Sequence, residues 1–237
     1  MKLPNKITPD NLIDTVVEIR YMLNVPFELV LGTFYTVLND NFEYVPTSVP
    51  LSNSQNQING LIIGAKPLWM ANENFKIQIT ENSIIFNTIN QYQGWNIYFE
   101  MIKNVLQKLM SVPAIHSFNR VGIRYICKYD SISLFTKLKG KVTLFSDDFE
   151  MDNATLRFEY FQSEKRIIVN LSNNIKIEHN SSDDFYSLVD IDVISVLPNS
   201  TDIQLIHKTI DETHAKEKEI FFGLFHEDFI KTLNPEY

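Results

Sequence analysis

The stretch of sequence that decides the fold is Arg120-Val121-Gly122-Ile123-Arg124-Tyr125-Ile126-Cys127. Apolar residues alternate there with Arg120, Gly122 and Arg124 at a period of two, the pattern of a strand with one buried face. The apolar positions are Val121, Ile123, Tyr125 and Cys127. We therefore expect a strand that packs one face on a core and carries two guanidinium groups, with a glycine between them, on the other.

The segments before this strand predict two helices and several further strands. Residues 13–21 alternate like a second half-buried strand, and apolar residues at helical spacing follow Pro26 and Gly94. Short strands are expected at residues 68–70, 75–80 and 83–88. If one short strand is set aside, the order is β-α-β-β-α-β, which is the order of a ferredoxin-like sandwich.

The segments after it predict a sheet backed by a helix. Strands are expected at residues 141–145, 155–161, 166–171 and 186–197. A long terminal helix is expected from about Asp202 to Lys231, interrupted or kinked near residues 219–223. The predicted fold is α+β: a ferredoxin-like first half, residues 1–130, packed as one compact unit with a second antiparallel sheet and its C-terminal helix, residues 131–237.

The composition excludes several classes of function. The 237 residues carry a net charge of −8, and such a chain repels the phosphates of nucleic acids. The single cysteine excludes an intramolecular disulfide and a thiolate-rich zinc site. The first residues lack the apolar region of a signal peptide, and no run reaches the roughly 20 apolar residues of a membrane span. We expect a cytoplasmic protein without a cofactor. Residues 46–60 are rich in polar residues and are expected to form an exposed loop.

Arginines on the predicted sheet form the main candidate site. In a ferredoxin-like order the first and last strands are neighbours, so Glu18 and Arg20 are expected beside Arg120 and Arg124, with Gly122 as an opening between them. Guanidinium groups bind carboxylates or phosphates bidentately, which suits an anionic ligand or an acidic partner. The alternative is an internal lattice, in which Glu18 or aspartates of the second half neutralise the arginines.

Other reactive residues make weaker candidates, and none is predicted to be catalytic. Asp190 and Asp192 are two apart and share a strand face, which makes them weak candidates for binding Mg²⁺. The histidines at 207, 214 and 226 lack the spacing of a helical metal pair and are interpreted as packing or capping residues. Cys127 falls on the apolar face of its strand, where a thiol behaves as a small hydrophobic group.

An ordered set of short motifs resembles a known family. The motifs are residues 16–20, Phe86-Asn87, residues 92–95, residues 120–125, residues 189–192, and a last helix with His214, Phe221 and Phe222. Over essentially the whole chain this set resembles a sporadically distributed family of uncharacterised prokaryotic proteins, although Cys127 stands where the family pattern has an asparagine. The resemblance implies a horizontally moved accessory gene, such as one for anti-phage defence or a toxin–antitoxin module, and it brings no catalytic residues.

Taken together, these observations predict a non-catalytic binding or regulatory protein whose partner is another protein, encoded nearby. The alternative is a sensor or enzyme that acts on an anionic small molecule such as a nucleotide, gripped by the arginines. A homo-oligomer is left open.

Overall fold

The computed structural model describes residues 3–46, 66–140, 153–176 and 184–237. The expected loop at 46–60, apart from Pro46, and the expected strand at 141–145 lie outside these residues. The first part of the chain forms β1 (Leu12–Leu23), α1 (Phe27–Leu38), β2 (Glu43–Tyr44), β3 (Leu68–Ala71), β4 (Phe75–Ile79), β5 (Ser83–Thr88), α2 (Trp95–Met110) and β6 (Ile115–Asp130). The rest forms a short 3₁₀ helix (Leu134–Lys137), β7 (Ala154–Gln162), β8 (Lys165–Lys176), β9 (Phe185–Ser200), α3 (Ile203–Leu224) and α4 (Glu227–Thr232).

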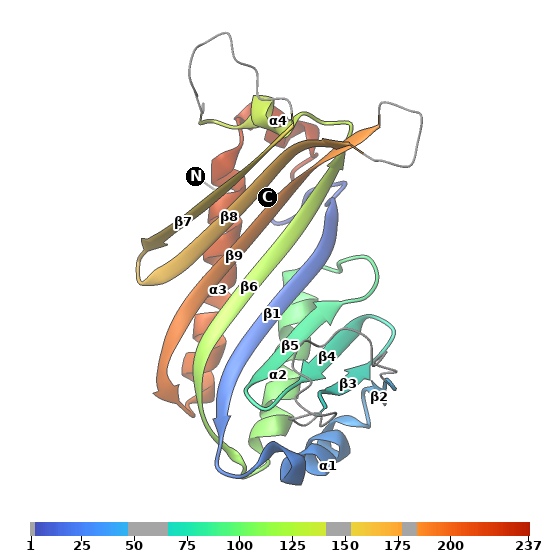
Figure 1. Ribbon diagram of the computed structural model, residues 1–237, viewed down its shortest axis with the longest axis vertical. Helices are drawn as coiled ribbons and strands as arrows, with labels where there is room; N and C mark the ends of the chain where they lie inside the picture. The colour runs from blue at the N-terminus through green and yellow to red at the C-terminus, as the bar shows by residue number, and fades with distance from the viewer. Residues whose placement is uncertain (1–2, 47–65, 141–152, 177–183) are drawn as a thin grey trace, which may run out of the picture. The chain divides into compact units, whose positions relative to one another are not determined.

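The fold is α+β, as the sequence predicts, with one large antiparallel sheet (Figure 1). The described strands follow the order β2-β3-β4-β5-β1-β6-β9-β8-β7. The expectation of a second, separate sheet is wrong, because β9 is the neighbour of β6 in this order and β7–β9 therefore extend the sheet begun by the first half. No helix among the described residues is long and apolar enough to cross a membrane.

The chain divides into two compact units. Unit 1 comprises residues 1–17, 121–196 and 208–237, and unit 2 comprises residues 18–120 and 197–207. A boundary at residue 130 does not separate these units, because β1, β6, β9 and α3 each contribute residues to both.

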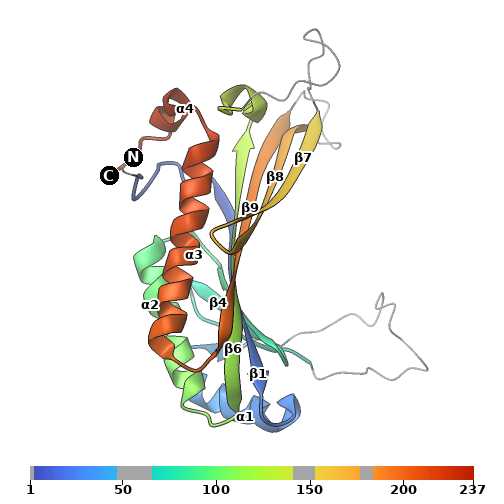
Figure 2. The same ribbon diagram turned by 90° about the vertical axis from the view of Figure 1, so that its left-hand side faces the viewer.

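Unit 2 has two helices on one face of its strands, α1 and α2 (Figure 2). The expected β4–β5 hairpin is confirmed: Ile79 pairs with Ile84, and Thr80 N–H donates to the Ser83 carbonyl at 2.9 Å. α2 begins after Gly94, whose φ of 95° lies in the region that favours glycine. The core of the unit lies between helices and strands and includes Ile19, Phe34, Leu38, Ile77, Phe86, Ile102, Leu106 and Phe118.

Unit 1 packs the C-terminal helices on the strands β7–β9. Its core includes Ile167, Val169, Leu171, Val189, Ile191, Phe221, Phe225 and Phe229. The last helix is interrupted as expected, but between Leu224 and Glu227 rather than at residues 219–223, since α3 is continuous to Leu224. The helix ends where Lys139 N–H donates to the Leu224 carbonyl and Leu138 forms a β-bridge with Phe225, which takes this backbone out of the helical ladder. His226 is then the N-cap residue of α4.

Candidate functional site

The faces of β6 are arranged as the sequence predicts. Val121 and Ile123 are fully buried, Tyr125 and Cys127 nearly so, and Arg124 is exposed. Arg120 is half-buried. Gly122 is buried, which leaves no open backbone for a ligand at that position.

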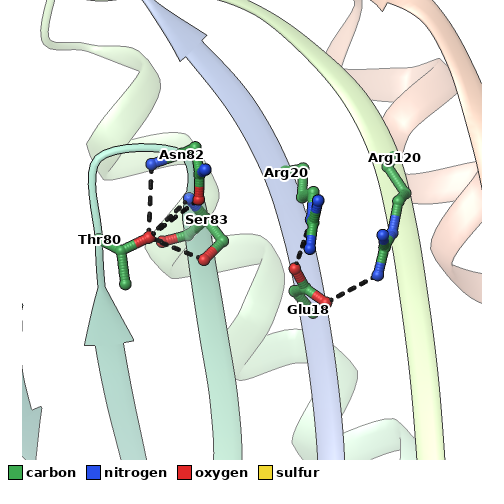
Figure 3. A network of polar contacts seen from close by, with 6 residues as sticks. All are labelled: Glu18, Arg20, Thr80, Asn82, Ser83 and Arg120. Carbon is green, nitrogen blue, oxygen red and sulfur yellow. Dashed lines mark hydrogen bonds and ion pairs between the residues drawn. The ribbon is translucent and has the colours of Figure 1, made fainter. Parts of the chain in front are cut away.

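In unit 2, Glu18 accepts hydrogen bonds from two arginines (Figure 3). Arg20 Nε donates to Glu18 Oε1 at 2.7 Å, and Arg120 Nη2 donates to Oε2 at 3.0 Å. We call these three residues the Glu18 cluster. Since two guanidinium groups share one carboxylate, the cluster has a net charge of +1. Arg120 Nε is buried and has no hydrogen-bond partner among the described residues.

The position of the Glu18 cluster follows from the alternation of β1. Ile19 and Tyr21 are buried, which places Glu18 and Arg20 on the strand face opposite α1 and α2. Tyr21 ties β1 to the β4–β5 turn: its N–H donates to the Asn82 carbonyl at 3.0 Å and its hydroxyl to the Thr80 carbonyl at 2.5 Å. These bonds fix the end of β1 that carries the cluster.

In unit 1, Arg124 forms a matched pair with Asp190. Arg124 Nε and Nη2 donate to the two oxygens of Asp190 at 2.7 and 2.9 Å, a bidentate pair. The hydrogen bonds that Arg124 donates to Asp190 are the main cause that raises the pKa of Arg124. Asn170 lies opposite Asp190 in the β8–β9 register and donates to it at 2.9 Å. The charges of Arg124 and Asp190 cancel, so this Asp190 cluster of Arg124, Asp190 and Asn170 is neutral by itself, and the negative charges of Asp192 and Asp14 also act on Arg124.

The hydrogen bonds of the Asp190 cluster continue across the sheet to β7. Arg157 Nη1 donates to Asn170 Oδ1 at 3.0 Å, and Glu159 accepts hydrogen bonds from Arg157 at 3.2 Å and from Arg166 at 2.8 Å. Sequence reasoning missed Asn170, Arg157 and Glu159. The alternation of Arg157 and Glu159 was visible, but their link to Asp190 depends on strand register, which no motif in the sequence specifies.

The two aspartates expected to share a strand face do so. Asp190 and Asp192 are both half-buried on β9, where their neighbours Val189, Ile191 and Val193 are buried. Both oxygens of Asp190 are engaged by Arg124, and one also by Asn170. The described residues contain no group of three His, Cys, Asp or Glu side chains that could hold a metal ion.

The helix-covered side of unit 1 buries three reactive groups. Burial raises the pKa of the Cys127 thiol well above its usual value, which keeps it protonated and unreactive. Burial lowers the pKa of His214 to about 3, and its ring lies 5.8 Å from that of Tyr125. Burial raises the pKa of Glu217 to about 8. Sequence reasoning missed Glu217, although its spacing from Ile210, His214 and Phe221 places it on the apolar stripe of α3.

His207 and a surface depression in unit 2 offer no better binding site. The His207 ring lies edge-on to Phe99 with 6.2 Å between the ring centres, and burial lowers its pKa. A depression of about 490 Å³ in unit 2 is lined in part by Tyr21, Glu28 and Glu81. Its two carboxylates disfavour an anionic ligand there.

The sequence matches no protein-family model and no curated protein.

Proposed function

We propose that the protein is a non-catalytic binding or regulatory protein, and that the Glu18 cluster binds an acidic segment of a partner protein. The observation that carries this proposal is the excess of one guanidinium group over carboxylates in that cluster. The Arg20 side chain is 45% exposed, so its remaining donors can reach a partner. Glu18 neutralises only one of the two arginine charges, and a carboxylate from the partner would neutralise the other.

The chain as a whole is acidic, but this does not prevent such binding. Charges farther away than about 8 Å are largely screened at physiological salt, so the nearest groups decide the interaction. The Asp190 cluster offers no comparable excess, because its carboxylate already matches its arginine. The proposal therefore assigns binding to Arg20 and Arg120 and a structural role to Arg124.

The biological setting proposed here rests on the family resemblance. A sporadically distributed prokaryotic family favours a cytoplasmic component of an accessory module, such as anti-phage defence or a toxin–antitoxin pair, with the partner encoded nearby. We further propose that unit 2 is ferredoxin-like. This is supported by the order β4-β5-β1-β6 and by α1 and α2 on one face.

The binding proposal is tested with a fluorescein-labelled peptide of eight glutamates. Fluorescence anisotropy would compare the full chain with the double variant Arg20→Gln, Arg120→Gln and with the matched control Arg124→Gln, at a temperature where circular dichroism shows all three folded. We expect the double variant to bind at least about tenfold more weakly, since each lost charge-assisted contact is worth about 1.5–3 kcal/mol. The control should stay within about twofold. Absence of binding by the natural chain, or an equal loss in the control, would overturn the proposal.

The alternative, a sensor or enzyme for an anionic small molecule, predicts a different result. A nucleotide present at a free concentration of 100 times its Kd would stabilise the fold by about 2.7 kcal/mol. A thermal-shift screen with nucleotides and Mg²⁺ therefore separates the two proposals: a shift that Arg20→Gln, Arg120→Gln removes favours the small molecule.

A further inference from the structure

β7 is a sheet edge with exposed aromatic side chains. It is the last strand in the order, and among the described residues no strand pairs with its outer side. Phe158, Tyr160 and Phe161 are 42%, 39% and 74% exposed. Exposed edges of this kind tend to pair with another chain, and exposed apolar side chains beside them mark protein-binding surfaces.

The hairpin that joins β7 to β8 determines which backbone groups face outward. Gln162 pairs with Lys165 across a two-residue turn, in which Ser163 and Glu164 have φ values of 51° and 62°. Residues that flank such a turn exchange both of their backbone hydrogen bonds. Even-numbered residues of β7 therefore bond to β8, while residues 155, 157, 159 and 161 point their N–H and C=O groups outward.

The side chains of β7 are self-complementary about Phe158, and we propose that a second copy of this chain pairs with it there. In an antiparallel pair with a two-fold axis at Phe158, Arg157 of each copy lies opposite Glu159 of the other. Residue 157 of one copy and residue 159 of the other then form a hydrogen-bonded pair through the N–H and C=O groups that face away from β8. The register that satisfies the backbone hydrogen bonds is therefore also the one that places opposite charges beside each other. Phe158 meets Phe158 in a non-hydrogen-bonded pair, where side chains are closest.

Neighbouring registers are disfavoured by charge. An axis at residue 157 places Arg157 opposite Arg157, and an axis at residue 159 places Glu159 opposite Glu159. Like charges directly opposite each other destabilise a strand pair, whereas opposite charges stabilise it. Among these three registers, only the axis at Phe158 pairs unlike charges on both sides.

The pairing also covers apolar surface that unit 1 leaves exposed. Leu156, Phe158 and Tyr160 lie opposite the buried residues Leu171, Val169 and Ile167 of β8, so they continue the helix-covered face of the sheet. Leu156 of each copy would lie opposite Tyr160 of the other. On the other face, Arg157 contacts Asn170 of the Asp190 cluster and Glu159 within its own chain, and Arg157 and Glu159 would each also form an ion pair with the second copy.

Cross-linking tests the register. A cysteine at 158 would lie about 4.5–5.5 Å, Cα to Cα, from its copy, within disulfide range. A cysteine at 160 would lie about 13 Å from its copy, out of range. Phe158→Cys should give a covalent dimer under mild oxidation, with thiols alkylated before denaturation, and Tyr160→Cys should give at least about tenfold less. Equal cross-linking at both positions, or none at 158, would overturn the register.

A charge exchange tests the interface without cysteine chemistry. By sedimentation equilibrium of the full chain, Arg157→Glu and Glu159→Arg alone should each raise the dimer Kd at least about tenfold, because each places like charges opposite. The double variant restores unlike pairs and should return the Kd to within about threefold. A natural chain that stays monomeric, or a double variant no better than the singles, would overturn the proposal. Neither experiment involves the Glu18 cluster, so this inference and the proposed function fail independently.

Discussion

Two arginines four residues apart on β6 have different surroundings. Arg124 holds both oxygens of Asp190, a carboxylate that is 14% exposed and also bound by Asn170. Arg120 donates to one oxygen of Glu18, and Arg20 donates to the other oxygen of the same carboxylate. A pattern of arginines on a strand therefore does not by itself define a binding surface. The two clusters differ in whether the carboxylate is shared: Glu18 is shared by two arginines, whereas Arg124 has both oxygens of Asp190. On this difference we proposed a structural role for Arg124 and a binding role for Arg120.

The largest effect is expected from breaking the strand that carries both arginines. Ile123→Asp places a carboxylate at a fully buried position and should abolish soluble expression and the cooperative unfolding transition, because a buried unpaired charge is very costly. Ile126→Asp, on the half-buried opposite face of β6, is the matched control and should fold. A stable Ile123→Asp protein would mean that the apolar face of β6 does not build the core.

Glu217 extends the comparison to a buried acid on the helix-covered side. The unfolded chain loses this proton near pH 4.5, whereas the folded chain keeps it up to about pH 8. Between these values the folded state binds more protons, so stability falls as pH rises, by at most about 1.4 kcal/mol per pH unit. Glu217→Gln should therefore be more stable than the natural chain at pH 8, by an amount on the order of 4 kcal/mol, with the difference vanishing below about pH 4.5.

Urea unfolding at several pH values measures this difference. The buried His214 contributes in the opposite direction, because its pKa of about 3 makes stability rise with pH between about 3 and its usual 6.5. That contribution is common to both proteins and cancels in their difference. A difference that does not grow between pH 5 and pH 8 would show that Glu217 is ionised in the folded state.

Loss of Arg124 should destabilise the protein moderately, because the Asp190 cluster loses its arginine. Arg124→Gln leaves the half-buried Asp190 without its bidentate partner and should lower the free energy of unfolding by about 2 kcal/mol. The expected loss of free energy is moderate because the Arg124 side chain is 47% exposed, and solvent screens its ion pair with Asp190. Urea denaturation measures it, and a loss below about 0.5 kcal/mol would remove the structural role assigned to Arg124.

The Glu18 cluster should respond least. Arg120→Gln leaves Glu18 paired with Arg20, so the free energy of unfolding should fall by no more than about 1 kcal/mol. The same denaturation experiment applies, with Arg124→Gln as the comparison on the same strand. A loss at Arg120 larger than that at Arg124 would reverse the roles proposed for the two arginines.

The sequence predicted what depends on periodicity and missed what depends on register. The alternation around Ile123 and Ile19 correctly gave the buried faces of β6 and β1, and the turn before Ser83 was also correct. Alternation leaves the choice of neighbouring strands open, so β7–β9 were assigned to a separate sheet. For the same reason, the sequence left open whether an external anion or Asp190 meets Arg124. Glu217 was missed because charged neighbours in α3 hide its position on the apolar stripe.

A pair of double-mutant cycles tests the comparison most directly. One cycle combines Arg124→Gln with Asp190→Asn, and the other combines Arg120→Gln with Glu18→Gln, each measured by urea unfolding of the full chain. We predict a coupling free energy of about 1.5–3 kcal/mol for Arg124 and Asp190, and below about 1 kcal/mol for Arg120 and Glu18. Equal couplings, or a larger one at Glu18, would contradict the assignment of structure to one arginine and binding to the other.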